Sequence, residues 1–97
     1  MDTNEIFHEF IRHSGLTQSE IGRRMGIDPT VVSGLVHRRR LFSWTYLAMF
    51  QYAYCWEESP FYLPGASAFA IRIAHNLRRL PPDALQSPEQ GGNGKQG

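Results

Sequence analysis

The chain has little of several features that would point to common functions. Cys55 is its only cysteine, so no disulfide and no cysteine-based metal site can form within one chain, as suits a reducing cytoplasm. The longest stretch without a charged residue, 41–56, is too short and too polar to span a bilayer. The opening MDTNEIFHEF is too acidic for a secretory leader. We expect a cytoplasmic protein without a membrane segment.

Residues that carry chemistry are sparse as well. The four histidines are scattered, and His8 and His13 lie five positions apart, which does not place them on one face of a helix. No phosphate-binding loop is present, and no Ser/His/Asp or Cys/His arrangement follows from the spacing. We expect no enzymatic activity, no bound metal and no cofactor.

Net charge alone excludes little, but its distribution is uneven. The formal charge is +1, whereas the stretch from Arg23 to Arg40 holds five arginines and one acid, Asp28, and so carries +4. The rest of the chain is slightly acidic. A basic stretch within a near-neutral chain favours a localised contact with an anionic partner.

Apolar residues recur at three- and four-residue spacing, which predicts an all-α protein. We expect five helices, at about 4–14, 18–25, 29–39, 44–56 and 66–79. Capping boxes are predicted at Asp2 or Thr3 with Glu5 and at Thr17 with Glu20, and further caps at Asp28 and Ser43. Residues 1–80 then form one domain. Residues 81–97, rich in glycine and without a periodic apolar pattern, are expected to be a disordered tail.

Two of these helices follow each other closely, within residues 17–38. Gly26 fits the turn between them, since a left-handed residue costs glycine little. Gly22 lies inside the first helix, where glycine costs about 1 kcal/mol. We expect it there because the second helix crosses so closely that a side chain would collide. This spacing predicts a helix-turn-helix.

The segment LTQSEIGRRMGIDPTVVSGLVHRRR, residues 16–40, resembles the helix-turn-helix of Cro/C1-type, phage-repressor-like (XRE family) transcription regulators. It has Gln18 at the start, Gly22 and Gly26 at four-residue steps, and apolar Val32 and Leu35. The resemblance implies a five-helix, lambda-repressor-like DNA-binding domain. A helical hairpin that binds no DNA is the structural alternative.

The resemblance also implies roles for particular residues. The second helix of the motif would lie in the major groove, with base contacts expected from its exposed positions. These positions are Pro29, Thr30, Ser33, Gly34 and His37, where Gly34 would let the bare backbone approach the DNA. Many relatives carry Gln near the position of Pro29, so direct base readout is expected to be sparse and DNA shape to contribute. Asp28 is read as a cap, with a cytosine contact as the alternative.

Phosphate contacts are expected from the start of the first motif helix and from the arginines. The residues are Gln18, Ser19, Arg23, Arg38, Arg39 and Arg40. The alternative for the arginines is a solvated basic face.

Nine of the twelve aromatic residues fall between Phe42 and Tyr62 and surround the helix at 44–56. So many rings cannot all turn inward from one helix in a small domain, and exposed aromatic patches mark interfaces. We expect the helices in 44–79 to form a homodimer or tetramer. The interface residues would be Trp44, Phe50, Tyr54, Phe69, Ile73 and Leu77. The alternative is that the loop at Phe61–Tyr62 and the last helix cover the rings within one chain.

Together these features predict a sequence-specific regulator that binds double-stranded DNA, a phage- or prophage-type repressor on an inverted-repeat operator, in a bacterial cell or an infected host. The alternative is an antitoxin that represses its own operon and binds a toxin through its C-terminal half. An antirepressor is a further possible protein partner. An activator contacting RNA polymerase would need an exposed acidic patch, for which Glu57–Glu58 is the candidate.

Overall fold

The predicted helices are all present in the computed structural model, which describes residues 2–79 and has no strand in this range. They are α1 (Thr3–Ser14), α2 (Gln18–Met25), α3 (Pro29–Val36), α4 (Trp44–Tyr54) and α5 (Ala66–Leu77). The tail predicted at 81–97 lies outside the described residues. No helix in the described range has the length and apolar character needed to cross a membrane.

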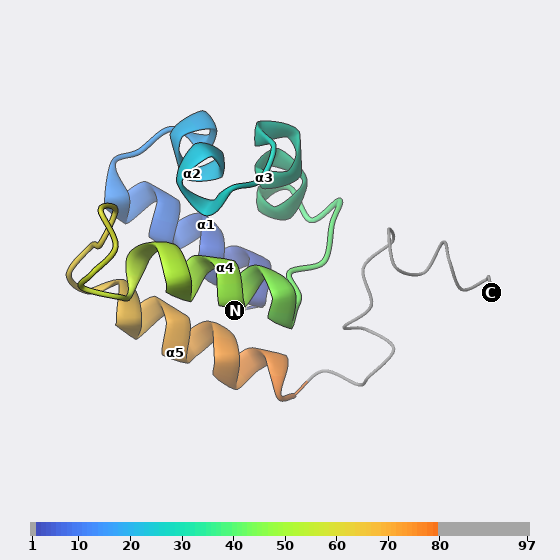
Figure 1. Cartoon of the computed structure of the whole chain (residues 1–97). Helices are drawn as coiled ribbons and strands as arrows, with labels where there is room; N and C mark the ends of the chain where they lie inside the picture. The colour runs from blue at the N-terminus through green and yellow to red at the C-terminus, as the bar shows by residue number, and fades with distance from the viewer. Residues whose placement is uncertain (1, 80–97) are drawn as a thin grey trace.

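The helices pack so that α2 and α3 form a separate pair. Helix α1 packs against α3 and α5, and α4 packs against α2 and α5. In Figure 1, α2 and α3 lie together on one side of α4, and α5 lies on the other side. The segment that resembles a DNA-binding motif is therefore supported by α1, which packs against α3, and by α4, which packs against α2.

Aromatic rings from α1, from α4 and from Phe42 just before α4 form the centre of the core. The rings of Phe10 and Phe50 lie 4.6 Å apart, and those of Phe7 and Phe42 lie 5.2 Å apart. All four side chains are at most 3% exposed. Burial of each such side chain contributes about 1.5–3 kcal/mol to folding, which is how so short a chain stabilises five helices.

The predicted helix caps are confirmed in part. The Asp2 carboxylate accepts from the Glu5 amide at 2.8 Å, and the Glu5 carboxylate accepts from the Asp2 amide at 2.9 Å, which completes the capping box of α1. The Thr17 hydroxyl accepts from the Glu20 amide at 3.1 Å. Ser43 stands at the N-cap of α4 but makes no side-chain capping hydrogen bond.

The predicted dimer interface is wrong for most of its residues. Phe50, Tyr54, Ile73 and Leu77 are each 0% exposed within a single chain. The phenol of Tyr54 donates to the Ile21 carbonyl at 3.3 Å. These side chains belong to the core, where α5 packs against α1 and α4 and the Phe10 ring of α1 contacts the rings of Phe50 and Tyr54. The rings are therefore covered within one chain, as in the single-chain alternative.

The two other predicted interface residues differ from each other. Phe69 is half-buried, with its ring 5.5 Å from that of Phe10, so it too packs within the chain. Trp44 is 41% exposed. Of the six predicted interface residues, only Trp44 presents a large part of its surface to a partner.

Candidate nucleic-acid interface

The turn between α2 and α3 brings the two helices into direct contact. Gly26 ends α2 in the left-handed conformation, with φ 78°, and the Ile27 amide donates to the Gly22 carbonyl at 2.9 Å. A Cβ atom on Gly22 would lie 2.8 Å from the Ile27 carbonyl oxygen and 3.2 Å from Cγ2 of Val32. The predicted close approach at Gly22 is confirmed, and it fixes how α3 is presented.

Helix α3 begins at a cap that also engages its first polar side chain. The Asp28 carboxylate accepts from the Thr30 amide at 2.9 Å and from the Thr30 hydroxyl at 2.7 Å. These two hydrogen bonds, the backbone one first, lower the pKa of Asp28 below its usual value. Asp28 is therefore a charged cap, and the Thr30 hydroxyl is already donated within the chain.

The outer face of α3 carries four of the five predicted base-contacting residues. Pro29, Thr30 and His37 are exposed and Ser33 is half-buried. Their spacing of three to four residues places them on one side of the helix. Within α3 this side carries only the small side chains of Pro29, Thr30 and Ser33, and the helix has no acidic residue.

Gly34 does not belong to this face. It is buried, and a Cβ atom there would lie 3.3 Å from the Cβ of Arg40. The side chain of Arg40 therefore covers Gly34. The prediction that Gly34 exposes bare backbone is wrong, because the chain after α3 folds back over this position.

The fold-back also ends α3 earlier than predicted, at Val36 instead of near Arg39. Arg38 has φ 59°, the only positive φ among the non-glycine residues described. The Arg39 and Arg40 amides both donate to the Gly34 carbonyl, at 2.8 and 3.1 Å. This is a Schellman-type helix end with arginine where glycine is usual.

The arginines after α3 are held by partners within the chain. Arg38 Nε lies 2.9 Å from the Asp2 carboxylate, and its Nη2 pairs with Glu5. These contacts, led by the hydrogen bond to Asp2, raise the pKa of Arg38. Arg39 Nη2 donates to the Ser33 hydroxyl at 3.1 Å. Ser33, predicted to contact a base, and Arg39, predicted to contact a phosphate, are thus hydrogen-bonded to each other.

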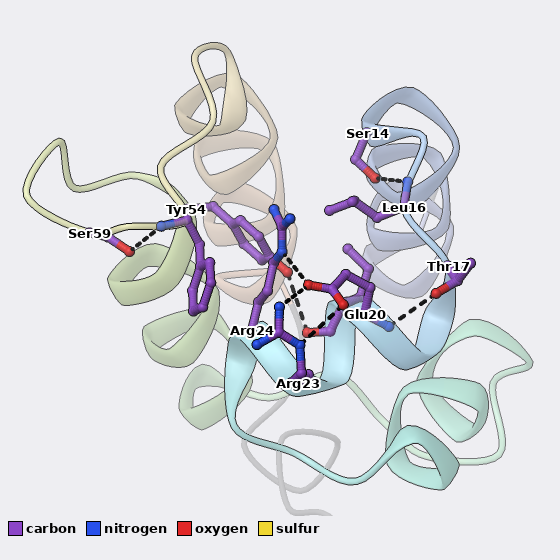
Figure 2. Close-up of polar contacts among 10 residues, drawn as sticks. Ser14, Leu16, Thr17, Glu20, Arg23, Arg24, Tyr54 and Ser59 are labelled. Atoms are coloured by element: carbon purple, nitrogen blue, oxygen red, sulfur yellow. Dashed lines mark hydrogen bonds and ion pairs between the residues drawn. The ribbon is translucent and has the colours of Figure 1, made fainter.

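The basic residues of α2 are directed elsewhere. Figure 2 shows Arg23 and Arg24 converging on the Glu20 carboxylate, with Arg24 Nε at 2.8 Å. The capping-box prediction had the Glu20 side chain reaching back to the cap of α2, but it binds these two arginines instead. Their hydrogen bonds, that of Arg23 more than that of Arg24, lower the pKa of Glu20 to about 2. Both guanidinium groups also lie over the Phe61 ring, at 5.4 and 5.2 Å. Arg23 is therefore placed beside the α4–α5 loop and not with the arginines that follow α3.

The first turn of α2 holds the remaining predicted phosphate contacts. Ser19 is exposed and Gln18 is half-buried. Backbone amides at a helix N-terminus attract anions. Gln18 and Ser19 thus lie in the first turn of α2, and their phosphate contact stays a prediction.

Asn4 holds the end of α3 in position, although the sequence pattern predicted no role for it. Asn4 is 6% exposed, and its side-chain amide donates to the Leu35 carbonyl at 2.6 Å and to the Arg40 carbonyl at 2.9 Å. It ties the end of α3 and the following loop to α1. The only signal in the sequence is a polar side chain on the apolar side of the first predicted helix.

Within residues 2–79, no three histidine, cysteine or acidic side chains are grouped so that they could hold a metal ion. Comparisons with protein-family models, with curated proteins and with solved structures find no match to this chain.

Proposed function

We propose that this protein is a sequence-specific regulator that binds double-stranded DNA, with α2 and α3 as a helix-turn-helix in a lambda-repressor-like domain. Helix α3 enters the major groove, with its exposed N-terminal half toward the bases. The chain acts as a homodimer on an inverted-repeat operator, where it represses transcription.

One observation carries this proposal. A short helix without acidic residues is held against α2 at Gly22 and is followed directly by three arginines. Its outer face offers Thr30 and Ser33, whose small side chains let the helix approach base edges, and His37 follows at the helix end. A helical hairpin with no ligand has no need for an acid-free, polar outer face beside a basic segment.

The ion pairs of Arg38 make the proposal more specific. Asp2 and Glu5 occupy the guanidinium group that DNA phosphates would bind. Both pairs are at the surface, where such contacts are worth about 0–1 kcal/mol, so phosphates can replace the carboxylates. We therefore expect Asp2→Asn, which keeps a good capping residue, to raise the affinity for DNA of any sequence.

The test is selection of bound duplexes from a random pool with the full chain, followed by footprinting at two salt concentrations. The expected result is an inverted repeat whose half-site centres lie about 34 Å apart. Binding must be much tighter than to random DNA and must weaken with salt. Absence of any enriched sequence would overturn the proposal.

Matched variants assign the contacts. Arg39→Ala should weaken binding to all sequences and reduce the salt slope by about one, whereas Arg12→Ala, an exposed arginine on α1, should change neither. Thr30→Ser keeps the hydroxyl that binds Asp28 and removes only the methyl group, so it should lower discrimination at a single thymine. Equal losses from Arg39→Ala and Arg12→Ala would rule out α3 as the contacting helix.

A further inference from the structure

Helix α4 carries no charged residue on either of its sides. Its inner side buries five residues, Tyr46, Leu47, Phe50, Ala53 and Tyr54. Its outer side also lacks charge, since the whole sequence of the helix, WTYLAMFQYAY, contains no acidic or basic residue. A surface helix normally carries charged residues opposite its apolar face, and a helix apolar all round is covered on all sides. The outer side of α4 is therefore unlike an ordinary solvated surface.

The outer side of α4 carries Trp44, Ala48 and Tyr52 at four-residue spacing, and Trp56, two residues after the helix ends, extends this row. Trp44, Tyr52 and Trp56 are 41%, 66% and 53% exposed, and they are three of the four large hydrophobic side chains exposed in the described chain. The Tyr52 and Trp56 rings contact each other at 4.9 Å. An open hollow of about 480 Å³ lies beside them, lined also by Ala48 and Met49 of α4 and by Arg24 and Met25 of α2. The row thus has bulky rings and a recess that can receive one.

The two ends of this row carry opposite charge: the positive end of the α4 dipole lies near Trp44, and two carboxylates follow Trp56. The N-terminus of α4 has no acidic residue in its first turn and no side-chain cap hydrogen bond from Ser43, so its positive dipole end is not neutralised by a side chain of that turn. At the opposite end, Glu57 and Glu58 follow the helix and are exposed. They line a second hollow with Tyr52 and Trp56, and no basic residue lines that hollow.

We propose that a second copy of this chain covers the outer side of α4, with the two α4 helices antiparallel about a two-fold axis. This arrangement sets Trp44 of each copy against Trp56 of the other, and Ala48 against Tyr52. It also places Glu57 and Glu58 of each copy at the positive N-terminus of the other copy's α4. A parallel arrangement would instead bring the four carboxylates together, which charge repulsion disfavours.

The inference rests on the proposed function for the expectation of two copies, and it fits the geometry of DNA binding. Figure 1 shows α2 and α3 on one side of α4 and α5 on the other. A two-fold axis that runs from the α5 side to the α2–α3 side keeps both α3 helices on the same side of the dimer. One DNA duplex can then contact both.

Sedimentation equilibrium of the full chain without DNA tests the interface independently of any DNA binding. We expect a concentration-dependent dimer. Ala48→Glu, which places a charge at the centre of the row, should weaken dimerisation about tenfold or more. Ile71→Glu is the matched control, because Ile71 is 70% exposed on α5 and lies outside the row. A monomer at all concentrations, or equal weakening by both variants, overturns the proposal. A monomeric chain would leave this face to a different protein, as an antitoxin requires.

Cross-linking tests the direction of the helices. In a Cys55→Ser background, Ala48→Cys residues are separated along the helix axis by about 6 Å in the antiparallel dimer, and Thr45→Cys residues by about 15 Å. A short bismaleimide should join the former efficiently and the latter poorly. Equal cross-linking of both variants indicates parallel helices and overturns the proposal. A circular dichroism melt of each variant confirms that it is folded.

Discussion

The side-chain amide of Asn4 lies 2.6 Å from the carbonyl oxygen of Leu35, across 31 positions of sequence. The same amide group reaches the Arg40 carbonyl at 2.9 Å. Through these two hydrogen bonds the first turn of α1 holds both the last turn of α3 and the arginine segment after it. The position of the proposed DNA-binding surface relative to the core thus depends on one buried amide.

We expect Asn4→Leu to lower the free energy of unfolding by about 1–3 kcal/mol, because it removes two hydrogen bonds, one of them fully buried. Urea denaturation followed by circular dichroism measures this. His8→Ala, on the exposed side of α1, serves as the control and should change stability by less than about 0.5 kcal/mol. Wild-type stability of Asn4→Leu would mean that the two hydrogen bonds do not hold α3 in place.

Gly22→Ala should destabilise the fold although alanine is the better helix former. Its Cβ would meet the Ile27 carbonyl oxygen at 2.8 Å, and backbone at a tight turn cannot move away without cost. We expect a net loss of about 1–3 kcal/mol. Gly34→Ala is the comparison, since its Cβ meets only the Arg40 side chain, at 3.3 Å and beyond. A Gly34→Ala loss as large as that of Gly22→Ala would contradict this assignment.

Arg38 has a left-handed backbone conformation, which destabilises the fold, and two ion pairs, which stabilise it. Two substitutions measure these two contributions to stability separately. Arg38→Ala loses the ion pairs and keeps the left-handed conformation, whereas Arg38→Gly loses the ion pairs and removes the strain. Arg38→Gly should therefore be more stable than Arg38→Ala by about 1 kcal/mol. Thermal unfolding of the pair measures the difference. If Arg38 also contacts a phosphate, both variants should lose DNA affinity alike, whatever their stabilities.

Acid should weaken the fold partly through Glu20. The hydrogen bonds from Arg23 and then Arg24 lower its pKa from 4.5 to about 2 in the folded chain. A carboxyl group with a lowered pKa stabilises the fold above its unfolded pKa, and this contribution disappears as pH falls through the folded value. Melting temperatures should therefore decline as pH falls from 4.5 toward about 2.

Glu20→Gln is the test of that assignment, since glutamine does not titrate. Its melting temperature should depend less steeply on pH over the same interval. The remaining slope is expected from Asp28 and Glu9, whose pKa values are also lowered, by hydrogen bonds from Thr30 and Arg72 respectively. An unchanged slope in Glu20→Gln would show that its ion pairs are absent in solution.

The helices and most of their starts could be predicted because they depend on neighbouring residues. Asp2 with Glu5, Thr17 and Asp28 act within three positions of the groups they cap. The close approach at Gly22 was also predictable, since the turn after Gly26 leaves α3 few directions. In each case the sequence separation is short, and a local pattern carries the information.

Local sequence patterns could not predict where α3 ends or which aromatic side chains are buried. Arg38 is left-handed where its guanidinium group meets Asp2 and Glu5, residues distant in sequence. Tyr54 is buried because its ring packs 5.1 Å from that of Phe10 and its hydroxyl donates to the Ile21 carbonyl, 33 positions away. An apolar pattern that runs all round a helix does not say which side meets the core.

The sequence by itself therefore determined the five helices, the caps at Asp2, Thr17 and Asp28 and the close α2–α3 pair, because hydrogen bonds and steric limits within a few residues decide them. Only the tertiary structure decided which side chains remain available for partners. It buried Phe50 and Tyr54, covered Gly34 with Arg40, and left Tyr52 and Trp56 exposed. Those outcomes follow from which helix faces bury the most apolar surface against each other, and that is a property of all the helices packed together.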